Sequence, residues 1–120
     1  MANLTLQVTI PAAGVVNLAT ALPVNSSGQA PMTVSGTMYV EFLQFQNNSA
    51  HAIRYGCDRN VSVTTPAAAN GGTAGRGILL APGSPGGAGA VSTPVTYATM
   101  LQDWYLAGTS GDVIDILALQ

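Results

Sequence analysis

The stretch from residue 101 to residue 119 most constrains the fold, because its residues alternate in character at every second position. Trp104 and Leu106 share one predicted face, and Tyr105 and Ala107 share the other. The later segment V-I-D-I-L-A places Ile, Ile and Ala on one face and a mixed set on the other. A period of two is typical of β-strands, and the intervening G-T-S-G supplies the backbone freedom of a tight turn. We therefore predict a β-hairpin at the core of the domain.

Shorter segments with the same alternation occur along the rest of the chain. Glycine, proline, asparagine and serine separate them about every ten residues, which is typical of a β-sandwich or barrel. The expected strands span residues 4–10, 15–18, 32–46, 52–55, 60–64, 77–83 and 91–97, in addition to the hairpin. We therefore predict an all-β fold, a single β-sandwich domain over residues 1–120 with about eight short antiparallel strands.

Glycine, alanine and proline dominate between residues 66 and 89. Two loops, residues 67–76 and 84–90, are predicted to flank the brief strand between them. The glycine segment 71–77 lacks the Lys-Ser/Thr ending of a P-loop, so it does not predict nucleotide binding. It is interpreted either as a flexible loop or as an arm that orders against a neighbouring subunit, with Arg76 as its polar anchor.

The chain carries very little charge. Its 120 residues include three basic side chains, all arginines, and five acidic ones, for a formal net charge of -2. Nucleic-acid binding depends on many Lys and Arg contacts with phosphates, so it is disfavoured here. A surface of Ser, Thr, Asn, Gln, Gly and Ala loses little hydration energy on burial, so we expect part of it to contact other subunits. The alternative is a neutral sandwich that remains a monomer.

The sequence also bears on where the protein is made. The first residues, M-A-N-L-T-L-Q-V-T-I-P, lack the basic and continuous apolar regions of a signal peptide, so export by the general route is not expected. No run approaches the ~18 apolar residues of a membrane span. A single cysteine, Cys57, fits assembly in a reducing cytoplasm.

No group of residues predicts an enzyme, a cofactor or a metal site. His51 and Cys57 could form a catalytic pair, but a hydrogen-bonded loop histidine and a small buried thiol are the favoured interpretation. Asp112 and Asp115 stand three apart, so in one strand they face opposite ways and cannot share an ion. We expect Asp112 to bond the backbone of its turn, and Asp115 to pair with an arginine or to face a subunit boundary.

Several residues are candidates for contact with a partner. Arg54, Tyr55 and Arg59 lie close together in the sequence. They form either a surface ion pair with Asp58 or an interface contact, since Arg and Tyr often anchor interfaces. The complete set of candidate interface residues is Arg54, Tyr55, Arg59, Arg76 and Asp115.

Four sequence elements together resemble a known class of proteins. They are the strand ending I-P-A-A-G at residues 10–14, the central strand followed by Asn47 and Asn48, the L-A-P-G element at 80–83, and the closing D-W-Y-L-A-G-T-S-G-D-V-I-D-I-L. This pattern looks like that of small β-sandwich virion proteins of tailed bacteriophages. It is most similar to auxiliary capsid proteins, called decoration or cement proteins, which have jelly-roll-like folds.

The resemblance implies a structural protein that is made in the host cytoplasm and becomes part of the virion. It would bind the major capsid protein on the outside of the assembled shell, as a homo-oligomer (a dimer or trimer), and would stabilise that shell. A head-fibre, tail or adaptor module is the first alternative. A carbohydrate-binding or adhesin-like sandwich, with Trp104 or Tyr39 contacting the glycan, is the second.

Overall fold

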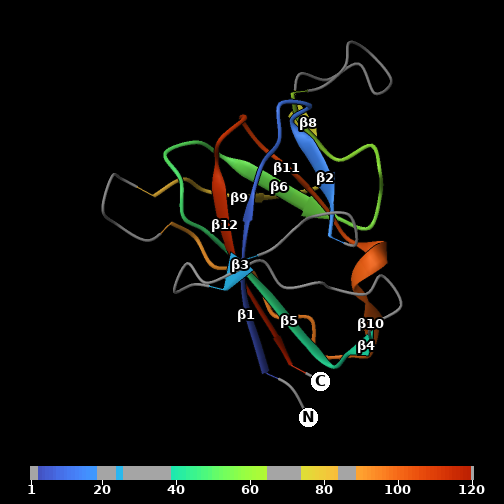
Figure 1. Ribbon diagram of the computed structural model, residues 1–120. Coiled ribbons are helices and arrows are strands. Elements are labelled where there is room, and N and C mark those ends of the chain that lie inside the picture. Colours follow the sequence, from blue (N-terminus) through green and yellow to red (C-terminus); the bar gives the residue numbers. More distant parts are fainter. Residues whose placement is uncertain (1–2, 19–23, 26–38, 65–73, 84–88, 120) are drawn as a thin grey trace.

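The computed structural model describes residues 3–18, 24–25, 39–64, 74–83 and 89–119 (Figure 1). Twelve strands and one short 3-10 helix, η1, lie in this part of the chain. Their bounds are β1 Asn3–Thr9, β2 Val15–Asn17, β3 Val24–Asn25, β4 Tyr39–Val40, β5 Phe42–Asn47, β6 Ile53–Gly56, β7 Ser62–Thr64, β8 Ala74–Arg76, β9 Ile78–Leu80, β10 Thr99–Met100, η1 Leu101–Asp103, β11 Tyr105–Ala107 and β12 Val113–Leu119. The prediction of an all-β fold is confirmed.

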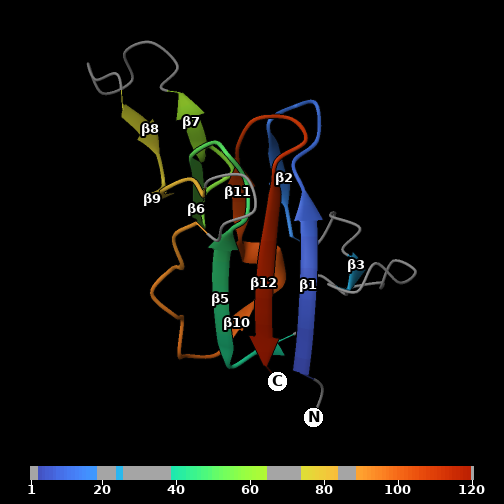
Figure 2. The same ribbon diagram turned by 90° about the vertical axis from the view of Figure 1, so that its left-hand side faces the viewer.

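The strands form two facing four-stranded sheets. One has the order β3-β1-β12-β5 and the other the order β2-β11-β6-β9, and every pairing is antiparallel. Figure 2 shows β1, β12 and β5 side by side in front of the second sheet. Two small two-stranded ribbons, β10-β4 and β7-β8, accompany them. The architecture is therefore a sandwich, as the alternation of short strands predicts.

The order of the strands follows a simple rule. Residues 91–95 bridge to β5 through Val91 and Val95 and so extend the first sheet. Among the eight sandwich segments taken in chain order, the first pairs with the last, the second with the seventh, the third with the sixth and the fourth with the fifth. Those segments are β1, β2, β5, β6, β9, residues 91–95, β11 and β12. The chain is thus an antiparallel ribbon folded over on itself.

The prediction that β11 and β12 form a hairpin is wrong. β11 pairs with β2 and β6, whereas β12 pairs with β1 and β5 in the opposite sheet. Leu106 and Ile114 are both fully buried, so the apolar faces of the two strands meet across the core rather than side by side. The connection must then span the ~10 Å between facing sheets, which a tight hairpin turn does not do. Gly111, with φ 92°, makes the bend.

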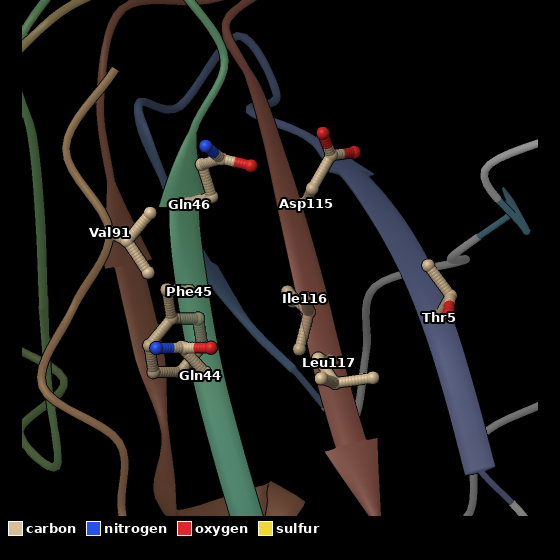
Figure 3. Close-up of a pocket in the computed structure, with 8 residues that line it drawn as sticks. All are labelled: Thr5, Gln44, Phe45, Gln46, Val91, Asp115, Ile116 and Leu117. Atoms are coloured by element: carbon tan, nitrogen blue, oxygen red, sulfur yellow. The ribbon is translucent and has the colours of Figure 1, made fainter. Parts of the chain in front are cut away.

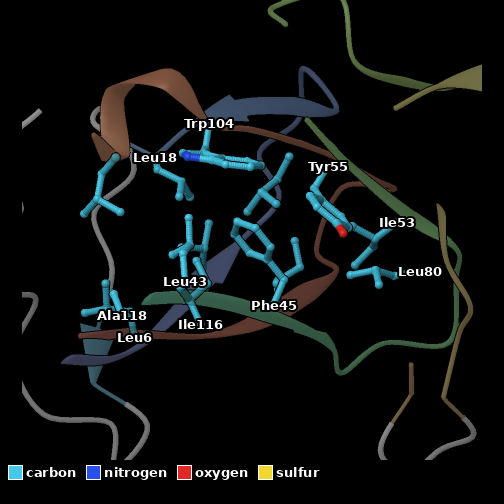
Figure 4. Close-up of a cluster of buried hydrophobic side chains, with 14 of the residues drawn as sticks. Leu6, Leu18, Leu43, Phe45, Ile53, Tyr55, Leu80, Trp104, Ile116 and Ala118 are labelled. Atoms are coloured by element: carbon cyan, nitrogen blue, oxygen red, sulfur yellow. The ribbon is translucent and has the colours of Figure 1, made fainter. Parts of the chain in front are cut away.

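Three aromatic rings form the centre of the core (Figure 4). The ring centroid of Phe45 lies 4.9 Å from that of Tyr55 and 5.8 Å from that of Trp104. The tilted arrangement of these rings is favourable beyond the burial of their area. The indole Nε1 of Trp104 donates to Thr99 Oγ1 at 2.9 Å, so its polar atom is paired inside the core. Trp104, just before β11, and Leu106, within it, are both buried, so the face that they were predicted to share points into the core.

Two further expectations need correction. The strand predicted over residues 32–46 is described only from Tyr39, and a bend at Glu41 divides it into β4 and β5. The break lets Val40 and Leu43, three positions apart, both be buried. The loop predicted over 67–76 contains strand β8 at its end, while residues 67–73 and 84–88 lie outside the described part. In the described part of the chain, residues 91–95 lie at a sheet edge, as Pro94 predicts.

The side chain of Asn47, at the end of β5, joins the two sheets. It is fully buried, and its Nδ2 donates to the carbonyl oxygens of His51 at 2.8 Å, Leu80 at 3.1 Å and Ala81 at 3.2 Å. Its Oδ1 accepts from the backbone N of Ser49 at 3.0 Å and from the Ser49 hydroxyl at 2.8 Å. Leu80 is in β9, so this amide ties the first sheet to the edge of the second.

Gly89 fits closely against this junction. Its backbone N donates to the Asn47 carbonyl at 2.9 Å, and an added Cβ would lie 2.5 Å from that oxygen. No side chain is accommodated at such a distance. A glycine is therefore required where the chain passes the end of β5.

We predict that Asn47→Ala lowers the free energy of unfolding by about 3 kcal/mol, because it removes the amide that bonds the buried Leu80 carbonyl and the Ser49 N–H. Asn48→Ala is the matched control, since Asn48 is exposed and adjacent. It should lower stability by less than about 1 kcal/mol. Urea unfolding followed by the fluorescence of Trp104 measures both. Equal losses for the two variants would contradict the role given to Asn47.

Candidate partner interface

Asp115 lies on the outer face of the β1-β12-β5 layer. Alternation along β12 buries Ile114 and Ile116 and turns Asp115 outward, half-buried, between Gln7 of β1 and Gln46 of β5. Its Oδ1 accepts from Gln7 Nε2 at 3.1 Å and its Oδ2 accepts from Asn48 Nδ2 at 3.1 Å. The expected arginine partner is therefore replaced by two neutral amides. Among the side chains that the structure describes, none of the basic ones pairs with this carboxylate.

A shallow hollow of about 420 Å³ surrounds this carboxylate (Figure 3). Asp115 and Gln46 project beside each other from neighbouring strands in the view of Figure 3, with Val91 and Leu117 nearby. The lining residues are Thr5, Gln44, Phe45, Gln46, Val91, Asp115, Ile116 and Leu117. Amides, a hydroxyl, one carboxylate and two exposed aliphatic side chains offer hydrogen bonds and apolar contact together. This outer face of β1, β12 and β5 is called the amide face below.

The arginine-tyrosine cluster does not form one surface. Tyr55 is only 4% exposed and packs in the aromatic core, which removes it from the candidate interface. Arg54 points outward from β6, where its Nη1 donates to the Gly77 carbonyl at 2.7 Å. Arg59 is exposed in the turn after β6. The interface roles of Arg54 and Arg59 stay predictions.

Asp115 and Arg76 complete the predicted set. Asp115 and Arg54 face opposite sides of the sandwich, because β12 and β6 belong to different sheets. The backbone of Arg76 pairs with Ser62 in the β7-β8 ribbon, and its side chain lies outside the described part. The structure therefore brings none of the arginines that it describes next to Asp115.

His51 and Cys57 lie at opposite ends of β6. A strand rises about 3.3 Å per residue, so roughly 20 Å of chain separates them. Cys57 is exposed rather than buried, which corrects the interpretation of a buried thiol. Partial burial and the negative charge of Asp103 raise the pKa of the Cys57 thiol. A raised pKa leaves less of the nucleophilic thiolate at neutral pH.

His51, in the connection between β5 and β6, instead pairs with Asp112, in the connection between β11 and β12. Its Nδ1 lies 2.8 Å from Asp112 Oδ1, and the side chains are 57% and 5% exposed respectively. The other oxygen, Oδ2, accepts from the backbone N of Thr109 at 2.9 Å, so Asp112 bonds its turn as predicted. The loop histidine was expected to bond locally, but its partner is 61 residues away in the sequence. Only the fold brings the two side chains together.

The two aspartates serve separate purposes. Asp112 is buried and bonded to the turn, while Asp115 faces outward and is bonded to amides. No group of three or more potential metal-ligating side chains occurs among the residues that the structure describes. Within the same residues, no helix is long and apolar enough to span a bilayer.

A second hollow, of about 410 Å³, lies beside the β10-β4 ribbon. It is lined by Tyr39, Cys57, Tyr97, Ala98, Thr99, Met100 and Asp103. Tyr39 and Tyr97 are among the most exposed large side chains described. Trp104, by contrast, is buried, so it cannot stack on a glycan. The sequence singled out Tyr39 but gave no signal that Tyr97 would join it.

Comparison with known proteins identifies no relative: no family model, curated protein or solved structure matches this sequence. Function must therefore be inferred from the amide face, the tyrosine-lined hollow and the strand edges of this chain.

We predict that Asp112→Ala lowers the free energy of unfolding by about 2 kcal/mol, because the Thr109 N–H loses the buried carboxylate that accepts from it. His51→Ala should cost less than about 1 kcal/mol, since the histidine is mostly exposed and its pairing is screened by water. Denaturant unfolding at neutral pH measures both variants. A smaller loss for Asp112→Ala than for His51→Ala would contradict this assignment.

The thiol of Cys57 should react slowly with iodoacetamide. Its raised pKa means that the thiolate fraction, and so the alkylation rate, rises with pH around a midpoint above that of free cysteine. Asp103→Asn removes the nearby negative charge and should shift this midpoint downward. Mass spectrometry of timed aliquots between pH 7 and 10 follows the reaction. A midpoint below that of free cysteine would contradict the sign.

Proposed function

We propose that the protein is a structural virion protein, which binds the outside of an assembled tailed-phage capsid and stabilises it as a decoration protein. The observation that carries the proposal is the amide face, where three long neighbouring strands present Gln, Thr and Leu side chains around one amide-bound carboxylate. An extended, almost neutral face of this kind suits a protein whose task is to cover another protein surface.

The chemistry of the amide face favours attachment over catalysis. The two oxygens of Asp115 already accept hydrogen bonds from Gln7 and Asn48, so part of the carboxylate's hydration is replaced before any partner arrives. Gln44 is likewise anchored, because its Nε2 donates to the Ser92 carbonyl at 3.2 Å. Groups that are ordered in advance lose less entropy on binding.

The strand order supports the same proposal. In a jelly roll, an antiparallel ribbon wraps so that its first and last strands meet in one sheet. The pairing of β1 with β12, and of β2 with β11, follows that pattern. Jelly-roll-like folds are what the resemblance to decoration proteins implies.

The proposed mechanism is the burial of area, repeated over a symmetric lattice. A homo-oligomer, a dimer or trimer, would place two or three amide faces on neighbouring major capsid proteins. Linking weak contacts in this way raises the overall affinity far above that of one contact. The shell would be stabilised because the bound protein ties adjacent subunits together.

The expected result is that purified protein cosediments with capsids that lack it, with saturable stoichiometry, and raises their heat resistance. Leu117→Lys should weaken binding at least about tenfold, because it places a charge that must be desolvated in the contact. Thr109→Lys adds the same charge at an exposed site outside the amide face and serves as the control. Failure of the unmodified protein to cosediment would contradict the proposal.

A head-fibre, tail or adaptor module is distinguished by location. Electron microscopy of particles carrying the gold-labelled protein should show label over the head. Label confined to the tail would replace the decoration role with this alternative.

A carbohydrate-binding role has one observation in its favour, the hollow between Tyr39 and Tyr97. Exposed aromatic rings can stack on a sugar, and the Asp103 carboxylate beside them can accept hydrogen bonds from its hydroxyl groups. A glycan array read with the unmodified protein and with Tyr97→Ala tests this role. Binding that the substitution abolishes would support it, and an empty array would reject it.

A further inference from the structure

Strand β9 forms one edge of the second sheet in the described part of the chain. β6 pairs with it on one side, and Figure 2 shows it at the left-hand margin of the sandwich. Its first two residues, Ile78 and Leu79, are 59% and 51% exposed. They are among the few large apolar side chains that the fold leaves in contact with water.

The exposure of Ile78 does not follow from its place in the strand. Side chains alternate along β9, so Ile78 shares a face with Leu80, which is 3% exposed and packs in the core. Ile78 therefore points to the core side of its sheet, yet the opposite sheet does not cover it. The apolar interior is incomplete at this edge.

Within its three described residues, β9 also carries none of the features that keep strand edges apart. Charged side chains, prolines and bulges normally prevent an edge strand from pairing with another chain. The sequence carries no charged residue from position 77 to position 102. On the outer face, however, Arg54 pairs across from Leu79 and its Nη1 donates to the Gly77 carbonyl, so the uncharged side of the strand is that of Ile78 and Leu80.

The neighbouring edge of the first sheet is protected. There the backbone N of Ser92 donates to the Phe45 carbonyl, and that of Val95 donates to the Leu43 carbonyl. From Ser92 to Val95 the edge segment advances three positions, while β5 advances two between Phe45 and Leu43. The segment therefore contains one extra residue, as in a β-bulge, and Pro94 lies within it. At the far edge of the second sheet, β2 is half-buried. Of these three edges, β9 carries the two most exposed aliphatic side chains, Ile78 and Leu79.

We propose that β9 is a self-association surface, which pairs antiparallel with β9 of a second copy about a two-fold axis. A two-fold contact uses the same patch on both partners, so one operation covers both exposed edges and both Ile78 side chains. A net charge of -2 gives little repulsion between copies. This inference names the contact behind the oligomer in the proposed function, and it rests on that part of the proposal.

The dimer has a structural consequence. Pairing through β9 continues the second sheet from one copy into the other, while the amide face belongs to the first sheet and stays free. Each dimer would therefore present two amide faces. Two linked faces provide the repeated attachment on which the proposed mechanism depends.

Sedimentation velocity over a range of protein concentrations tests the inference. The unmodified protein should sediment as a dimer at tens of micromolar. Ile78→Lys should raise the dissociation constant of the dimer at least tenfold, because an edge lysine is charged and must be desolvated on pairing. Leu117→Lys, which adds the same charge to the amide face, should leave it unchanged. Near-UV circular dichroism of Trp104 checks that both variants are folded.

Hydrogen exchange supplies a second reading that needs no substitution. Backbone N–H groups of β9 should exchange more slowly as the concentration rises and the dimer forms.

A monomer at every concentration, a trimer, or a dimer that Ile78→Lys leaves intact would each overturn the inference. A monomer that still binds capsids would reject the β9 contact alone. A dimer that binds no capsid would reject the decoration role alone.

Discussion

The relative placement of the two sheets depends on the hydrogen bonds of the buried Asn47 side chain. The apolar core gives most of the attraction between the sheets, but it does not fix how their ends meet. Asn47 fixes it, because one amide at the end of β5 satisfies carbonyls of His51, Leu80 and Ala81 while accepting from Ser49. A buried amide left without those partners would be strongly unfavourable, so the fold is held to one arrangement.

The sequence predicted the class of fold and most strand positions, because alternation of buried and exposed residues is a local property. It did not predict which strands pair. Residues 104–118 look the same whether β11 and β12 lie side by side or across the core, and only contacts with β1, β2, β5 and β6 decide this. The same limit applies to Asp112 and His51, whose partnership depends on the connection between the sheets. For Asp115 the sequence predicts an arginine partner or a subunit boundary, whereas its two amide partners come from other segments of the chain.

The surface of the protein carries few charges, and the fold divides it into regions with different chemistry. The amide face is polar, ordered and nearly neutral, the β9 edge is apolar, and the hollow beside β10-β4 is aromatic. A net charge of -2 gives only weak long-range attraction to a partner, so contacts must come mainly from close fit and hydrogen bonding. That requirement suits a partner whose binding sites are repeated and fixed in space, as on a shell.

Electron cryo-microscopy of capsids that have been incubated with the purified protein tests the central claim most directly. The account predicts additional density at symmetry-related positions on the outer surface, with β1, β12 and β5 facing the shell and Asp115 inside the contact. Capsids without additional density, or density that attaches the sandwich through the β2-β11-β6-β9 sheet, would contradict it.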